Sequence, residues 1–184
     1  MILPVLQYPD ERLRQISQPV GEITDDIREL ASNMLETMYA EEGIGLAAPQ
    51  VGQFVRLVVI DLSPCAESED SEDIEAGLYN GLAMPMILVN PELTLSGGTV
   101  KSEEGCLSVP NNYRASVSRR EKVLLKAVDL DGKPIELAAE GMLAICLQHE
   151  CDHLDGKLFI DYLSRLKRSL YESKLKKKLK QETK

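Results

Sequence analysis

The sequence predicts an α+β fold in which mostly antiparallel strands pack around one central helix. Apolar residues recur at helical spacing between Ile27 and Tyr39, and several β-rich segments follow that region. One pair of these segments is separated by Asp131-Gly132, a dipeptide typical of a tight hairpin turn. The stretch from Met142 to Leu147 has no polar face, which is typical of a helix buried on all sides.

The first predicted element is an N-terminal amphipathic helix. Thr24 is a suitable N-cap, and Asp25 and Asp26 place negative charge in the first turn, where the helix dipole favours it. The apolar positions are 27, 30, 31, 34, 35, 38 and 39, and Gly43 follows them as a helix stop. We therefore expect one face of this helix to pack on the core.

The strands are predicted from runs of β-branched and aromatic residues bounded by turn signals. The richest of these runs, FVRLVVIDL, begins at Phe54. The segments expected to form strands are 54–62, 87–89, 98–102, 122–129 and 134–137. A last helix is expected from Ser164 to about Lys180, where leucines alternate with many lysines.

Charge is distributed unevenly along the 184 residues, which we expect to form a single domain, 1–184. Segment 66–76 contains six acidic residues, all within the nine residues 67–75, and is predicted to be a mobile, solvated loop. Segment 165–184 carries a net charge of +7 within a chain of net charge −9, which leaves −16 on the first 164 residues. The acidic body argues against DNA binding, whereas the basic C-terminal helix could dock on ribosomal RNA or simply aid solubility.

Composition also limits the location of the protein. No apolar run approaches the length of about 20 residues that a membrane span needs. The first ten residues contain two prolines and no positively charged region, so they do not form a signal peptide. We expect a cytoplasmic protein without membrane contact, whose four cysteines are free, buried or metal-bound.

The two histidines of the chain lie four residues apart in the pattern H-E-x-x-H, at His149 and His153. On a helix this spacing places both imidazoles on one face, where they can share one metal ion. Glu150 lies directly beside them and can act on a water molecule. A catalytic site of this kind needs a third protein ligand.

Several residues are candidates for that third ligand. The pattern in which a third histidine follows Gly156 fails, because Phe159 occupies its position. Glu172 lies at a distance found in another protease class, but in a lysine-rich segment.

Four cysteines remain as further candidates. Cys65 borders the acidic segment, Cys151 is expected to face away from His149, and Cys146 is expected to form a wall near the site. Cys106, which follows a glycine, is a plausible thiolate ligand, although a buried apolar thiol is an equal alternative.

Three separated segments resemble the signature motifs of the peptide deformylase family. They are GIGLAAPQ at 43–50, EGCLS at 104–108 and QHECDH at 148–153, in the order and at the separations found in that family. Flanking stretches at 6–13 and 157–163 are also similar, so the resemblance covers nearly the whole chain.

The resemblance implies a metal site and a reaction. Cys106, His149 and His153 would bind one ion per chain, typically Fe²⁺, with Zn²⁺, Ni²⁺ or Co²⁺ able to replace it. The substrate would be a nascent peptide that begins with N-formylmethionine, and the products would be formate and a free N-terminus. Glu150 would accept the proton of the attacking water and pass it to the leaving amine.

The resemblance also implies roles for the remaining motif residues. The side-chain amide of Gln50 and the backbone N–H of Leu107 would donate to the oxyanion, although Gln50 read alone could be an ordinary surface amide. The backbone of Gly43, Ile44 and Gly45 would pair with the peptide, although Gly43 could also end the preceding helix. The residues implied to line the methionine pocket are Ile44, Met142, Ile145 and Cys146.

Two other functions are compatible with the sequence taken without the resemblance. One is a zinc metalloprotease in which Glu172 completes the metal site. The other is a metal-binding or ribosome-associated protein without catalytic activity.

Overall fold

The computed structural model describes residues 1–65, 78–79 and 82–182. The acidic segment 66–76, predicted as a mobile loop, lies outside these residues. Within the described part of the chain, helices combine with a five-stranded antiparallel sheet in the order β1-β2-β5-β6-β7. The predicted mixture of helices and antiparallel strands is therefore confirmed.

The sheet contains strands of very different lengths. Its members are β1 (Gly45–Ala47), β2 (Leu57–Ile60), β5 (Met86–Glu104), β6 (Ala115–Val128) and β7 (Pro134–Glu140). A separate hairpin pairs β3 (Leu78–Tyr79) with β4 (Leu82–Ala83). Short 3-10 helices are Glu11–Arg14, Ala48–Val51, Ser63–Cys65 and Phe159–Tyr162.

The strand predictions were wrong in their boundaries. Segments 87–89 and 98–102 belong to one strand, β5, whose pairing with β6 shifts register twice. Asn90 has a φ of 52° and Gly97 has a φ of 75° near these two irregularities. Such residues are typical of positions where a strand bends without ending. The first β-rich run is strand only from Leu57 to Ile60, and β6 begins seven residues before Lys122.

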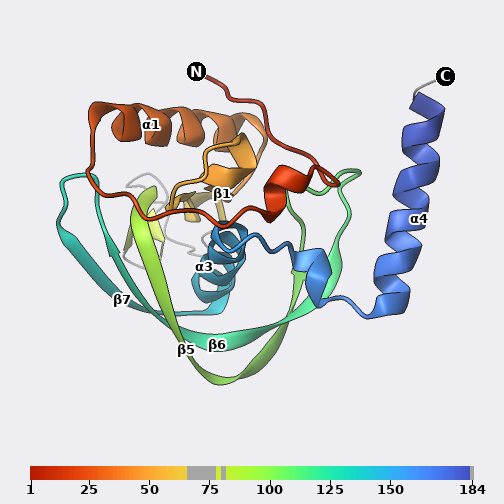
Figure 1. Ribbon diagram of the computed structural model, residues 1–184. Coiled ribbons are helices and arrows are strands. Elements are labelled where there is room, and N and C mark those ends of the chain that lie inside the picture. The colour runs from red at the N-terminus through yellow and green to blue at the C-terminus, as the bar shows by residue number, and fades with distance from the viewer. Residues whose placement is uncertain (66–77, 80–81, 183–184) are drawn as a thin grey trace.

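Helices α1 (Asp25–Ala40) and α3 (Gly141–Leu154) pack on opposite faces of β2. Leu57 and Val59 of β2 belong to the apolar cluster that contains Met34 of α1. Val58 and Ile60 belong to the cluster that contains residues of α3, because successive strand side chains point to opposite faces. Figure 1 shows β5, β6 and β7 curving beneath α3, so that α3 lies between these three strands and β1.

Thr24 occupies the N-cap position of α1, but its side chain makes no capping hydrogen bond. The position of the N-cap was therefore predicted correctly. The acidic residues in the first turn, Asp25 and Asp26, still stabilise this end of the helix through the helix dipole.

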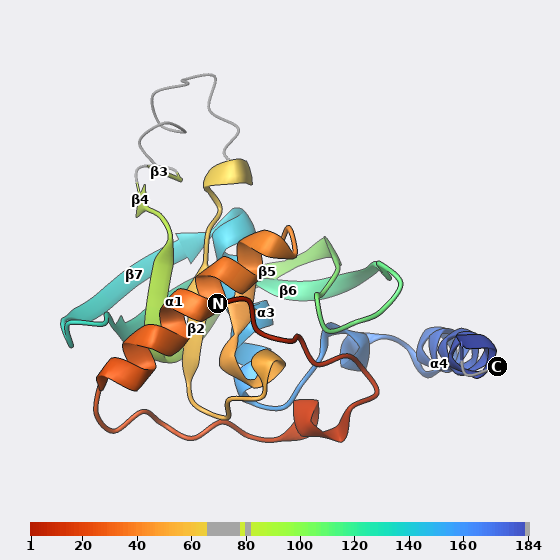
Figure 2. The same cartoon turned by 90° about the horizontal axis from the view of Figure 1, so that it is seen from above.

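Helix α4 (Arg165–Glu182) lies to one side of the sheet, as Figures 1 and 2 both show. Tyr171 and Leu175 are buried against a cluster that includes Val117 and Phe159. Leu166 is 71% exposed on the same helix. Among the described residues, no helix is both long enough and apolar enough to span a membrane.

Candidate metal centre

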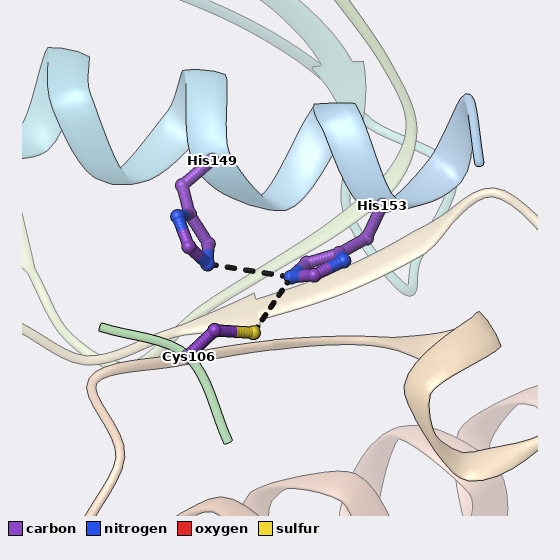
Figure 3. Close-up of side chains that lie close together, drawn as sticks. All are labelled: Cys106, His149 and His153. Atoms are coloured by element: carbon purple, nitrogen blue, oxygen red, sulfur yellow. Dashed lines mark hydrogen bonds between the residues drawn. The ribbon is translucent and has the colours of Figure 1, made fainter. Parts of the chain in front are cut away.

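The side chains of Cys106, His149 and His153 converge at one point, as Figure 3 shows. The sulfur of Cys106 lies 3.2 Å from Nε2 of His153, which lies 3.3 Å from Nε2 of His149. The three potential ligand atoms all lie within 4.8 Å of one another. Cys146, Cys151 and Glu172 are not part of this group.

Helix α3 and the loop after β5 bring these residues together. His149 and His153 lie one turn apart on α3, and both are buried. Strand β5 ends at Glu104, so Cys106 lies in the loop that faces the helix. Three lone-pair donors this close repel one another unless a proton or a cation lies between them. A thiolate with two imidazoles suits a borderline cation, so the residues fit a metal ion.

A buried carboxylate fixes the orientation of one imidazole. Oε2 of Glu104 lies 2.8 Å from Nδ1 of His149, and Arg119 donates to both oxygens of Glu104 at 2.7 and 2.8 Å. The carboxylate requires the proton on Nδ1, which leaves the Nε2 lone pair directed at the cluster. Burial alone would raise the pKa of Glu104, but hydrogen bonds from Arg119 and His149 lower it to about 2.

Arg119 links this carboxylate to the end of α3. It is 4% exposed and donates to Oδ2 of Asp152 at 2.5 Å. Tyr162 donates to the other oxygen of Asp152 at 2.9 Å, and its ring lies under the guanidinium. No role was predicted from the sequence for Glu104, Arg119 or Asp152.

Glu150 lies beside the cluster and is 4% exposed. Its Oε2 has no hydrogen-bond partner among the described residues. Burial raises the pKa of Glu150 to about 7, although the charge of His149 lowers it. A side chain with this pKa can accept and return a proton near neutral pH.

Gln50 is almost fully buried, so its interpretation as a surface amide is wrong. Its Oε1 accepts from the backbone N–H of Ala47 at 2.8 Å. Its Nε2 donates to Oγ of Ser108 at 3.2 Å and to the sulfur of Cys106 at 3.5 Å. The amide nitrogen therefore faces the donor cluster.

The glycine-rich segment approaches the other two motifs closely. A Cβ atom at Gly45 would overlap the carboxylate of Glu150, and one at Gly43 would lie 2.9 Å from a methyl carbon of Leu107. All three motifs therefore meet at one place.

The residues predicted to line a methionine pocket differ in exposure. Ile44 packs against the apolar cluster that contains Cys146, which is 5% exposed. Met142 is 42% exposed and Ile145 is half-buried, both in the first turns of α3.

Two imidazoles and a thiol beside a buried carboxylate form the donor set of a mononuclear metal-dependent hydrolase. The chain belongs to the polypeptide deformylase family, whose model matches residues 2–169. Members of this family are metal-dependent enzymes that act in protein biosynthesis, and the Cys/His cluster can hold the ion.

Curated relatives and solved structures are similar over nearly the whole chain. A peptide deformylase of Alkalilimnicola ehrlichii is 48% identical over 98% of this chain and 92% of its own length. Peptide deformylase 1 of Pseudomonas syringae pv. tomato is 51% identical over 96% of this chain and 95% of its own length. The crystal structure of a Legionella pneumophila peptide deformylase is 43% identical, covers 100% of this chain and 99% of its own, and has a TM-score of 0.83. The crystal structure of Ehrlichia chaffeensis peptide deformylase in complex with actinonin is 38% identical. It covers 96% of this chain and 97% of its own, with a TM-score of 0.83.

Proposed function

We propose that this chain hydrolyses the formamide bond of N-formylmethionine at the start of newly synthesised proteins and releases formate. The observation that carries this proposal is the convergence of Cys106, His149 and His153 beside the buried Glu150. Membership of the polypeptide deformylase family supports it. The site of action would be the cytoplasm, where nascent chains emerge.

Cys106, His149 and His153 would hold one metal ion through Sγ and the two Nε2 atoms. We propose Fe²⁺, with Zn²⁺, Ni²⁺ or Co²⁺ as substitutes, since a thiolate and two imidazoles accept any of these ions. When bound, the ion supplies Lewis acidity, which makes water nucleophilic near neutral pH. Glu104 keeps His149 in the tautomer that this role requires.

Glu150 would move the proton. Its carboxylate takes a proton from the attacking water and then gives it to the nitrogen of the leaving amine. Both transfers need a pKa close to the working pH, and burial raises that of Glu150 to about 7. Its Oε2 accepts no hydrogen bond from the part of the chain that the structure describes, so it is available for the transfer.

Gln50 and the backbone N–H of Leu107 would stabilise the negative charge on the formyl oxygen. Gln50 supplies Nε2, which faces the cluster, and its carbonyl oxygen is already occupied by Ala47. Donors held in place before the reaction cost no reorganisation during it.

The peptide would bind along the free edge of β1, because β1 is an outer strand of the five-stranded sheet. The backbone of Gly43, Ile44 and Gly45 would pair with the peptide there, as in other strand-addition complexes. The methionine side chain would enter a pocket formed by Ile44, Met142, Ile145 and Cys146.

Formate release from formyl-Met-Ala-Ser tests the proposal. Protein purified without oxygen and loaded with Fe²⁺ is expected to release one formate per peptide and to lose this activity after chelation. Mass spectrometry of the products separates the proposal from its protease alternative, in which the Met–Ala bond would break. The geometry gives that alternative no support, because Glu172 lies outside the cluster and accepts from Tyr8 and Arg168. Metal-loaded protein that releases no formate would overturn the proposal.

Replacing Gly45 with alanine is expected to lower kcat/KM for this peptide at least about tenfold, since small displacements of reacting groups can cost about 100-fold. The added methyl group would overlap the carboxylate of Glu150 and force it to move. Gly21→Ala is the matched control, because a Cβ there meets nothing within 4 Å. Equal rates for the two variants would contradict the close packing of Gly45 against Glu150.

We further propose that α4 docks on the ribosome. The residues that carry its exposed positive charge include Lys174, Lys176 and Lys177. Changing these three to glutamate is expected to weaken co-sedimentation with ribosomes and to flatten its dependence on salt, because fewer phosphates are contacted. Formate release from the free peptide should stay unchanged. The matched control changes Lys101, Lys126 and Lys133 to glutamate, and equal binding by both variants would refute docking through α4.

A further inference from the structure

Ser108 is fully buried and lies directly against Gln50. We propose that Ser108 is a positioning residue, whose hydroxyl fixes the side-chain amide of Gln50 in the orientation that receives the formyl oxygen. This inference rests on the proposed function, because Gln50 matters only where an oxyanion forms.

The amide of Gln50 can be held by its two ends. At one end, Oε1 accepts from the backbone N–H of Ala47 at 2.8 Å, which settles which end is oxygen. At the other end, Nε2 donates one hydrogen to Oγ of Ser108 at 3.2 Å. With both ends engaged, the second hydrogen of Nε2 has one direction left, toward the side of Cys106.

The positions of these two side chains are fixed by a third segment. The backbone N–H of Leu6 donates to the backbone carbonyl of Gln50 at 2.7 Å. The backbone N–H of Tyr8 donates to the backbone carbonyl of Ser108 at 2.8 Å. Segment 6–8 therefore holds both loops in one frame. The hydroxyl of Ser108 lies within this frame at hydrogen-bonding distance from Nε2, so the pair is preorganised rather than formed on binding.

Loss of the hydroxyl has a defined consequence. Without Oγ of Ser108, the sulfur of Cys106 is the side-chain acceptor that Nε2 still contacts among the described residues. The amide would then be held at its Oε1 end alone. Nε2 would move more freely, and its donor would be directed at the developing charge for a smaller part of the time. The effect should fall on the chemical step, since the peptide is bound by other groups.

A double-mutant cycle tests this role. Gln50→Ala is expected to lower kcat for formyl-Met-Ala-Ser by about 10²–10³-fold, as for other oxyanion donors. Ser108→Ala is expected to lower kcat about tenfold with little change in KM, because the donor remains but is directed at the charge for a smaller part of the time. The double variant should be no slower than Gln50→Ala, because Ser108 has nothing left to position.

Two further measurements do not depend on activity. In the zinc-loaded protein, NMR of the Gln50 side-chain amide should show restricted motion in the wild type and greater motion in Ser108→Ala, while bound metal stays the same. Ser17→Ala is the matched control, because Ser17 is buried and its hydroxyl has no partner among the described residues. Additive losses in the cycle, or an unchanged amide signal, would overturn the inference. A wild-type protein that releases no formate would instead refute the proposed function.

Discussion

Replacing Glu150 with glutamine is expected to lower kcat for formate release about 10³-fold, within the range found for general acid–base groups. Glutamine keeps the size of the side chain but cannot accept the proton of the attacking water. Oε2 of Glu150 has no partner among the described residues, so the replacement breaks no hydrogen bond there. Rates measured at saturating formyl-Met-Ala-Ser will show the loss directly.

The Glu150→Gln variant should still fold and bind metal, because Cys106, His149 and His153 are unchanged. Bound metal and thermal unfolding are therefore measured on the same sample. Glu29→Gln provides a matched control, because it makes the same chemical change at an exposed position of α1. If the Glu150 variant retained the wild-type rate with its metal bound, another group would have to move the proton.

The residues of the centre that could be predicted are those whose geometry is local. His149 and His153 share a helix face because of their spacing alone, and the glycine before Cys106 indicated a loop that could approach them. The resemblance added Gln50 and Gly45, which the structure places against Ser108 and Glu150.

Residues that depend on distant pairing could not be predicted. Arg119 meets Glu104 because β5 and β6 pair in a register that the sequence does not reveal. Arg119 occupies an inward position of β6, where the alternation of buried and exposed residues leads one to expect an apolar side chain. Because Arg119 is charged, the first half of β6 did not show the alternating pattern of a strand and was not predicted. One signal was available for Glu104, which lies two residues before Cys106 in the second motif.

The length of β5 was missed for a related reason. The strand at 87–89 was predicted to end before Asn90, a typical turn residue, and the next strand was predicted to begin only at Gly98. In the structure the chain bends at these positions and continues, because β6 pairs with it on both sides of the second bend. The resulting long hairpin carries Glu104 and Arg119 to α3.

Replacing Cys106 with serine is expected to weaken metal binding at least about 100-fold, more than the loss of a residue that only supports a ligand. A serine hydroxyl stays protonated near neutral pH and is a poor ligand for Fe²⁺ or Zn²⁺, whereas a thiolate is a strong one. The backbone N–H of Ser108 donates to the sulfur at 3.4 Å, and Nε2 of Gln50 donates to it at 3.5 Å. Serine fits the same space, so the fold should persist. Metal content per chain, measured after anaerobic purification, will show the loss together with the loss of formate release.

Cys65→Ser makes the same chemical change at an exposed position and should leave metal content and activity unchanged. The comparison also separates the two metal schemes. If Glu172 completed the site, the Cys106 variant would keep its ion and its activity. That result would refute the deformylase mechanism, because it would leave the thiol without a function. The structure favours the opposite result, since Glu172 already accepts from Tyr8 and Arg168, and Cys106 is the side chain that meets both histidines.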